Sequence, residues 1–287
     1  MRKIFFLFCV LSANATFGQN IDSMALVNAN WNSQKIAAKT KLITYHFKDK
    51  NLFNANQNIS FLEVGASKNS PNIALGSEEK ELKTTSVFGK ENDALAAING
   101  TFFDVKNGGS VDFIKVSGKV VAQNQLGKNE KRARHQQAAL VIENGKLEIK
   151  KWDGSRNWEN MLPEANIMNT GPLLLFNQQE QFLDTAAFNR LRHPRSAVGI
   201  KANGRIILLT VDGRNENSAG MSLFELAKTM RWLGCVSAIN LDGGGSTTLW
   251  VSGYGSNGVV NYPSDNKLWD HEGQRKVANV ILLKKKQ

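Results

Sequence analysis

Three segments of this chain carry two apolar runs that are separated by a short turn containing glycine. The clearest turn is Asn144-Gly145, a pair that favours the type I′ turn of a two-residue β-hairpin. The three predicted hairpins cover residues 111–121, 138–149 and 197–211, with turns at Ser117-Gly118, Asn144-Gly145 and Asn203-Gly204. Each hairpin joins two strands that run in opposite directions, so we expect much antiparallel sheet.

Most other apolar segments have the length of strands, and one segment has the spacing of a helix. Ser222 and Glu225 form a capping box, and the apolar residues after them keep helical spacing as far as Gly234. Hydrophobic residues make up 41% of the chain, which is enough for a core. We therefore predict a single α+β domain, built on a mostly antiparallel or mixed sheet with few helices. Further strands are predicted at residues 41–47, 59–66, 94–98, 236–241 and 275–283, and a short helix at 84–92.

The first residues are typical of a signal peptide. Arg2 and Lys3 precede an apolar run at residues 4–11, and small and polar residues lead to a predicted cleavage point near Gly18. The alternative is a buried N-terminal strand or short helix. The run is shorter than the roughly 20 residues that cross a bilayer. We expect no transmembrane segment, and we expect export to the periplasm or the extracellular space.

Charge and cysteine content narrow the possible partners and mechanisms. The formal net charge of +11 favours acidic partners such as phosphorylated glycans. No lysine-rich block is interleaved with aromatic residues, so we do not expect nucleic-acid binding. Cys9 lies in the predicted signal peptide, which leaves Cys235 alone among mostly apolar neighbours. We expect Cys235 to be a buried, inert thiol.

The most specific polar stretch follows the predicted strand at 236–241. Asn240 and Asp242 are two residues apart, so a strand places both on the same face. The next three residues are glycines, whose N–H groups can approach an anion closely, and two hydroxyl side chains follow. A plain turn needs only one or two glycines. This stretch therefore predicts a site: Gly243, Gly244 and Gly245, then Ser246 and Thr247.

Two further stretches place polar residues at strand ends. Asn99 directly follows the strand at 94–98 and precedes Gly100 and Thr101. The Asn99 amide could hold a sugar hydroxyl, or the segment could be a plain turn at the end of the strand. In the hairpin at 197–211, Arg195 and Asp212 flank the two strands and can share one edge of the sheet. An arginine there suits a phosphate, although a structural Arg–Asp pair is the alternative.

Six stretches, in this order, resemble the phosphodiester glycosidase family: 97–103, 169–172, 195–199, 211–214, 240–247 and 275–279. The resemblance implies an exported α+β domain that hydrolyses a sugar-1-phosphate diester at the sugar carbon. It divides the chain into a signal peptide (1–18), an N-terminal arm with the first strands (19–75) and a phosphodiester glycosidase-like domain (76–287). The expected substrate is a phosphorylated glycan or envelope polysaccharide.

Such a reaction needs a carboxylate at the sugar carbon and groups that hold the phosphate. The candidate carboxylates are Asp212 and Asp242, with the roles of nucleophile and base left open between them. We expect neither a metal nor a cofactor. The candidate substrate-binding residues are Asn99, Thr101, Arg195, Arg214, Asn240, Gly243, Gly244, Gly245, Ser246 and Thr247. Two other functions remain open, namely a phosphodiesterase that cuts the P–O bond and a non-catalytic glycan-binding module.

Overall fold

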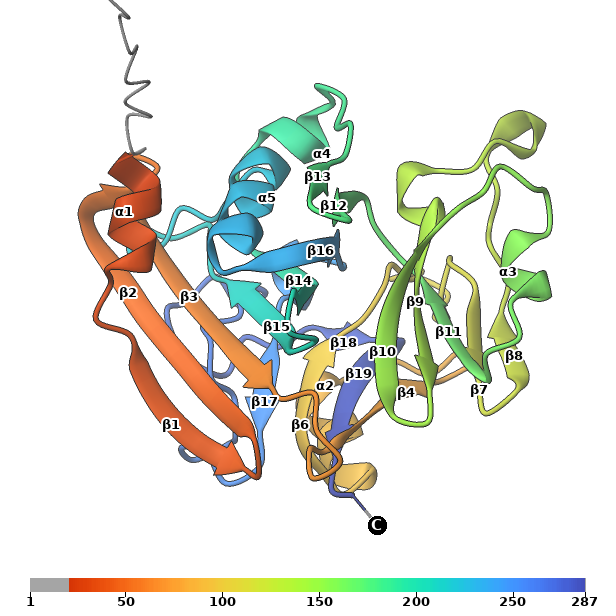
Figure 1. The fold of residues 1–287 in the computed structure, drawn as a ribbon, viewed down its shortest axis with the longest axis horizontal. Helices are drawn as coiled ribbons and strands as arrows, with labels where there is room; N and C mark the ends of the chain where they lie inside the picture. The colour runs from red at the N-terminus through yellow and green to blue at the C-terminus, as the bar shows by residue number, and fades with distance from the viewer. Residues whose placement is uncertain (1–20, 287) are drawn as a thin grey trace, which may run out of the picture.

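The computed structural model describes residues 21–286 and consists mainly of antiparallel sheet (Figure 1). The predicted signal peptide lies outside these residues. All strand pairings in the described part of the chain are antiparallel, and its few helices are short, which confirms the predicted α+β class. No helix within residues 21–286 has the length and apolar character needed to cross a membrane.

The largest sheet has eight strands and contains four of the predicted segments, namely 41–47, 59–66, 197–211 and 236–241. Its central hairpin pairs Arg195 with Val211 and Ile200 with Ile206, close to the expected register. The strands lie in the order β1 (Asn32–Ala37), β2 (Thr40–Leu52), β3 (Ala55–Val64), β15 (Ile206–Val211), β14 (Arg195–Lys201), β16 (Cys235–Asn240), β12 (Leu173–Phe176) and β13 (Gln179–Glu180). Because β3 pairs with β15, the first strands of the chain belong to the same sheet as the central hairpin.

Two smaller sheets and a two-stranded ladder complete the strand arrangement. The five-stranded sheet has the order β10 (Lys146–Lys151), β9 (Ala138–Glu143), β11 (Asn166–Asn169), β7 (Ile114–Val116) and β8 (Lys119–Ala122). The four-stranded sheet has the order β17 (Leu249–Val251), β6 (Ala94–Asn99), β19 (Asn279–Lys284) and β4 (Asn72–Ser77), and β5 (Lys83–Thr84) pairs with β18 (Lys276–Val277). The hairpin predicted at 111–121 begins later than expected, at Ile114, because the N–H of Val111 donates to the carbonyl of Phe102 (3.1 Å) instead.

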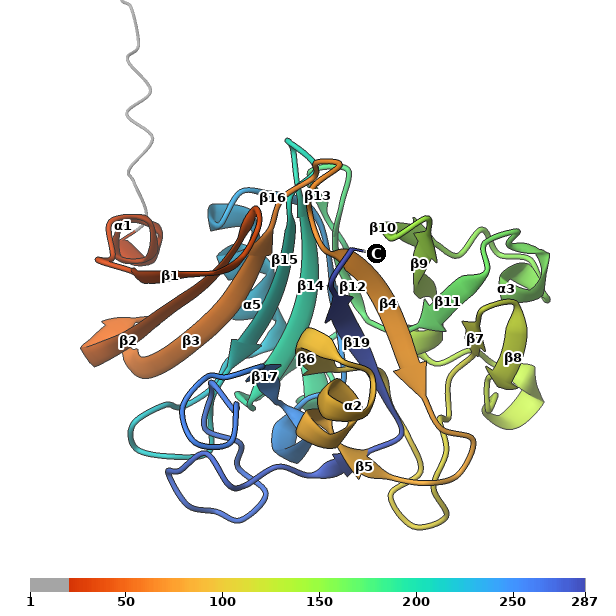
Figure 2. The same ribbon diagram turned by 90° about the horizontal axis from the view of Figure 1, so that it is seen from below.

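Helices cover the outer faces of the sheets (Figures 1 and 2). In the longest one, Ser222 accepts a hydrogen bond from the N–H of Glu225 (3.2 Å) and Glu225 accepts one from the N–H of Ser222 (2.9 Å), as the capping box predicts. Thr84 caps the predicted second helix. The α-helices are α1 (Ile21–Val27), α2 (Thr85–Glu91), α3 (Trp158–Met161), α4 (Ala187–Arg190) and α5 (Leu223–Trp232), and the 3-10 turns are Lys128–Glu130, Arg134–Gln136 and Gly244–Ser246.

One hydrophobic core is shared by the three larger sheets. Leu208 of β15, Ile98 of β6 and Leu140 of β9 all contribute to it. The neighbours of Leu208 in the strand, Ile207 and Leu209, point the other way and pack with residues of α5. Strand β15 is therefore buried on both faces, which is why its sequence is continuously apolar. The core holds the ends of β6, β14, β15 and β16 in fixed positions.

Candidate functional site

Backbone hydrogen bonds from two sheets hold Asp242. Strand β16 ends at Asn240, and the N–H of Asp242 donates to the carbonyl of Gly100, just beyond β6 (2.9 Å). The Asn99 amide donates to the carbonyl of Asp242 (2.7 Å), and its oxygen accepts from Ser196 (2.6 Å). Asp242 therefore occupies the point where the eight-stranded and four-stranded sheets meet.

The environment of Asp242 makes its carboxylate more basic than an exposed one. Burial raises the pKa of Asp242, while the Ser246 hydroxyl, the N–H of Gly243 and the charge of Arg275 act in the opposite direction. Asp112 also raises this pKa, so its charge lies close enough to act on Asp242. The N–H of Gly243 donates to Oδ1 of Asp242 at 2.9 Å.

The first two glycines do not form the open N–H cradle that the sequence suggests. The N–H of Gly243 is bonded to Asp242, and the N–H of Gly244 donates to the carbonyl of Pro194 (2.8 Å). A Cβ atom on Gly243 would come within 2.7 Å of the same carbonyl. This glycine is therefore needed because two backbone segments approach each other closely.

Gly244 and Gly245 provide space for arginines. A Cβ atom on Gly244 would come within 2.9 Å of Nη2 of Arg214, and one on Gly245 within 2.6 Å of Nη2 of Arg275. Gly244 also has a positive φ of 63°. Two guanidinium groups thus lie directly against the backbone that follows Asp242, and arginine is well suited to bind phosphate oxygens.

The two arginines differ in their partners. Arg214 is exposed, has a positive φ of 62°, and has no carboxylate within 4 Å among residues 21–286. Arg275 is half-buried, and its Nε donates to Oδ1 of Asp265 (2.8 Å). Arg275 belongs to one of the six stretches of the family resemblance, but it was absent from our candidate set. An unpaired cation beside a carboxylate marks the place where an anionic ligand would bind.

Arg195 lies in a different environment from the one expected for a phosphate clamp. Its side chain is fully buried, and its Nε donates to the carbonyl of Met221 (2.8 Å). Its Nη2 donates to the carbonyls of Phe188 (2.6 Å) and Leu191 (3.1 Å). Burial and the nearby charge of Arg214 lower the pKa of Arg195 to about 10. These bonds fix Arg195 as a support for the loops around the site.

Asp212 is likewise committed to its surroundings. Its Oδ2 accepts from the amide of Asn58 (2.8 Å), and its Oδ1 accepts from the amide of Asn261 (2.8 Å) and the N–H of Tyr262 (2.9 Å). Burial raises the pKa of Asp212, and these three bonds counter the rise. The carboxylate whose charge acts on Asp242 is Asp112. We therefore interpret Asp212 as a positioning residue.

The polar candidates fall into two groups. Asn99, Thr101 and Asn240 are buried and donate to carbonyl or carboxylate groups of the protein. By contrast, the Ser246 hydroxyl faces the carboxylate of Asp242, and the Thr247 hydroxyl is buried without a hydrogen-bond partner within the described residues. An unpartnered buried polar group costs about 1–3 kcal/mol, and such groups are concentrated where they have a further role.

Two residues of the site carried no signal in the sequence. Asp112 is fully buried and bonds to His135 across 23 residues of sequence, with 2.8 Å between Oδ1 of Asp112 and Nδ1 of His135. The Thr101 hydroxyl donates to Oδ2 of Asp112 (2.7 Å). A lone aspartate and a lone histidine in unrelated segments have no recognisable spacing, so only the folded chain brings them together.

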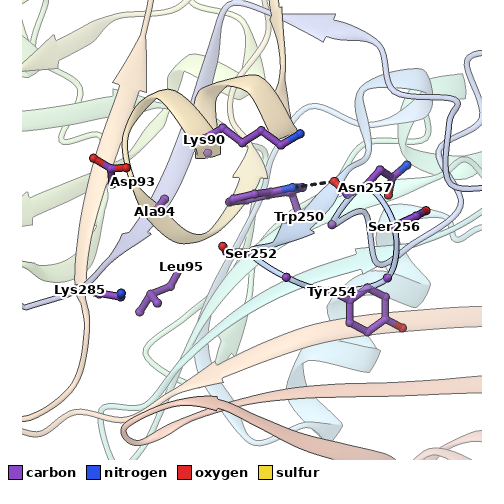
Figure 3. Close-up of a pocket in the computed structure, with 14 residues that line it drawn as sticks. Lys90, Asp93, Ala94, Leu95, Trp250, Ser252, Tyr254, Ser256, Asn257 and Lys285 are labelled. Carbon is purple, nitrogen blue, oxygen red and sulfur yellow. Dashed lines mark hydrogen bonds between the residues drawn. The ribbon is translucent and has the colours of Figure 1, made fainter.

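A large cavity lies elsewhere, at the other end of the four-stranded sheet (Figure 3). Its volume is about 510 Å³, and it lies beside Ala94 at the start of β6, whereas Asn99 is at the end of that strand. Trp250 lies in its wall and donates from Nε1 to the carbonyl of Asn257 (3.1 Å). None of the candidate residues lines this cavity.

The fold and the site define an α+β protein that presents one carboxylate and two guanidinium groups at the junction of two sheets. The chain belongs to the phosphodiester glycosidase family, whose model matches residues 92–284. This match covers about two thirds of the chain and includes all the candidate residues.

Curated relatives match a part of their own length. N-acetylglucosamine-1-phosphodiester alpha-N-acetylglucosaminidase of Bos taurus is 36% identical over 110 residues, which is 36% of this chain and 20% of that protein. The SPbeta prophage-derived uncharacterized protein YomE of Bacillus subtilis strain 168 is 31% identical over 97 residues, 29% of this chain and 15% of that protein. The alignments thus span a fifth or less of these relatives.

Solved structures share the fold. The zebrafish N-acetylglucosamine-1-phosphodiester alpha-N-acetylglucosaminidase catalytic domain has a TM-score of 0.66 and 21% identity, covering 90% of this chain and 89% of that one. A hypothetical protein from Synechocystis has a TM-score of 0.63 and 15% identity, and the match covers 88% of this chain and 63% of that one. Identities this low establish a common fold, and a common fold alone does not assign a reaction.

Proposed function

We propose that this chain is an exported hydrolase that cleaves the glycosidic bond of a sugar-1-phosphate diester in a phosphorylated glycan or envelope polysaccharide. One observation carries the proposal. The glycines after Asp242 allow the guanidinium groups of Arg214 and Arg275 to lie against the backbone beside that carboxylate. A carboxylate next to two cations is the arrangement that a sugar carbon bonded to a phosphate requires. The family membership of the chain supports the same reaction class.

The chemistry follows from the leaving group. Cleavage of the bond between the sugar carbon and the bridging oxygen releases a phosphomonoester, and the electron pair stays on the phosphate. Arg214 and Arg275 would neutralise this charge as it develops, which lowers the barrier. Asp242 would attack the sugar carbon or stabilise its positive charge. The raised pKa of Asp242 suits a base or a nucleophile.

The other candidate residues have supporting roles in this proposal. Ser246 would help to hold the carboxylate of Asp242, and the Thr247 hydroxyl has free hydrogen-bonding capacity. Asn99 and Asn240 would hold the backbone around Asp242, and Asp212 would hold the segment around Tyr262. The site would thus be kept rigid by buried amides, with the phosphate bound by arginines.

Hydrolysis in water labelled with ¹⁸O tests the proposal. The purified chain would be incubated with a panel of sugar-1-phosphate diesters, and the products analysed by mass spectrometry. Cleavage of the glycosidic bond places the label in the free sugar. Two variants serve as controls: Asp242→Asn should lose turnover, whereas Asp153→Asn, at an exposed surface position, should retain wild-type turnover.

Each alternative function has its own result in this experiment. Label in the phosphate would show cleavage of the P–O bond and overturn the glycosidase proposal. Binding of a diester without turnover, unchanged in Asp242→Asn, would indicate a glycan-binding module. Export is tested separately by the intact mass of the protein from the periplasm or medium, which should correspond to a chain that starts near residue 19.

A further inference from the structure

We infer that His135, held by Asp112, accepts the proton of the water molecule consumed in the proposed hydrolysis. This inference rests on the proposed function, since it assigns a residue to that reaction. His135 and Asp112 would form a dyad in which the histidine transfers the proton and the aspartate positions it. Both residues lie within the family match at 92–284 but outside the six short stretches that carried the resemblance.

Hydrogen bonds fix the orientation of the imidazole ring. Asp112 is fully buried and its carboxylate binds Nδ1 of His135 (2.8 Å) and the hydroxyl of Thr101 (2.7 Å). A carboxylate is an acceptor, so it favours the tautomer in which Nδ1 carries the proton. Nε2 is then the basic nitrogen, and it has no hydrogen-bond partner within residues 21–286.

Packing keeps the ring at a partly open position. The ring of Phe102 lies 4.5 Å from the ring of His135, measured between centroids. A Cβ atom on Gly171 would come within 3.1 Å of Cα of His135, so the backbone of this segment is held closely on its other side. The His135 side chain nevertheless keeps 27% of its surface exposed. It is therefore ordered by its neighbours and still accessible to water or a substrate.

The dyad is linked to Asp242 through Thr101 and Gly100. Thr101, which donates to Asp112, follows Gly100, and the carbonyl of Gly100 accepts from the N–H of Asp242 (2.9 Å). The charge of Asp112 also acts on the carboxylate of Asp242. The Asp112–His135 pair is thus linked to the proposed reacting carboxylate, and it is the only histidine–carboxylate pair within residues 21–286.

The surroundings of His135 leave its Nε2 free to take a proton. The nearest cation in sequence, Arg134, is directed away, with its Nε 3.7 Å from Asp184 and its guanidinium over the ring of Phe182. Within the described residues, Asp112 is the only carboxylate paired with His135, and its charge acts in turn on Asp242.

The proton transfer balances in one step. The oxygen of water forms a bond to the sugar carbon, and one of its protons moves to Nε2 of His135. The bond that breaks at that carbon leads either to the phosphate or to Asp242, if Asp242 has first formed a covalent intermediate. The resulting imidazolium is stabilised by Asp112, as in other histidine–aspartate pairs.

The test uses His135→Asn, whose amide can still donate to Asp112 but offers no basic nitrogen at the position of Nε2. We expect kcat to fall by about 10²–10⁴, the usual contribution of a general base. The acid limb of the pH–rate profile that the imidazole supplies should disappear. His46→Asn is the control. His46 bonds to the carbonyl of Asn217 in a loop (2.7 Å), so this variant should leave kcat and the acid limb unchanged.

A second measurement does not depend on a variant that folds. Nitrogen-15 NMR of the wild-type chain should show that the neutral imidazole of His135 carries its proton on Nδ1 and none on Nε2. The opposite tautomer would overturn the inference, as would a His135→Asn variant that keeps its rate within tenfold and its acid limb. If either result is found while the wild-type enzyme is active, the role of His135 is overturned and the glycosidase proposal stands. If the wild-type chain is inactive on every diester, both the glycosidase proposal and the role of His135 are overturned.

Discussion

The guanidinium group of Arg275 lies against Gly245, in the space that any other side chain at this position would occupy. A Cβ atom on Gly245 would come within 2.6 Å of Nη2 of Arg275 and within 2.5 Å of Oδ1 of Asp265. Asp265 binds the same guanidinium and keeps it in place. The missing side chain therefore brings the arginine close enough to lower the pKa of Asp242.

Gly245→Ala should displace Arg275 and remove its charge from the site. We expect kcat/KM for a sugar-1-phosphate diester to fall by about 10²–10³, as when one charge-stabilising group is lost. Gly127→Ala is the control, because the nearest atom to its Cβ would lie at 3.4 Å. Steady-state kinetics and a crystal structure of the variant would check this. Unchanged kinetics with a displaced Arg275 would remove this residue from the mechanism.

Asp242→Asn should abolish turnover without weakening the fold. We expect kcat to fall at least about a thousandfold, since each tenfold corresponds to about 1.4 kcal/mol of barrier. The pKa of Asp242 is raised in the folded chain, so the ionised carboxylate opposes folding once the pH exceeds its pKa. At pH 7 the variant should therefore unfold at the same or a higher temperature than wild type, and this difference should vanish in acid. Calorimetry across pH measures it.

Asp212→Asn should have the opposite effect on stability. All three partners of this carboxylate are donors, namely the amides of Asn58 and Asn261 and the N–H of Tyr262. An asparagine would direct its own N–H group at one of them, at a cost of about 1–3 kcal/mol. Chemical denaturation at neutral pH measures this loss. A variant that folds as stably as wild type but is inactive would instead restore Asp212 as a catalytic candidate.

Arg195→Lys should impair folding as well as activity. Lysine keeps the charge but has no planar fork for the three carbonyls that the guanidinium binds. We expect the free energy of unfolding to fall by about 1–3 kcal/mol. Arg205→Lys is the matched control, because Arg205 is half-exposed and forms a surface pair with Glu63 whose loss should cost under about 1 kcal/mol. Equal stability of the two variants would contradict this interpretation.

Cys235→Ala should leave activity unchanged. The thiol is buried against Gly199, and burial raises its pKa to about 12, so the reactive thiolate does not form at neutral pH. We expect kcat within a fewfold of wild type and a loss of about 1 kcal/mol in stability. In the folded wild type, a thiol reagent at pH 8 should label Cys235 only after denaturant is added. Rapid labelling of the native chain would show that the thiol is accessible.

Local patterns in the sequence determined most of the fold. Turn residues such as Asn144-Gly145 and the capping box of Ser222 and Glu225 act over a few positions, so they place hairpins and a helix correctly. The position of Asp242 after an apolar strand was also visible, because alternation along a strand decides which residues share a face.

Only the tertiary structure decided what these residues bind. Arg195 and Asp212 looked available in the sequence, yet the folded chain surrounds each with complementary partners from distant segments. Conversely, Asp112 meets His135, and Arg275 meets Gly245, across separations that no local pattern records. The physical reason is that hydrogen bonds and charges act between neighbours in space. Those neighbours are fixed only once the three sheets close around their common core.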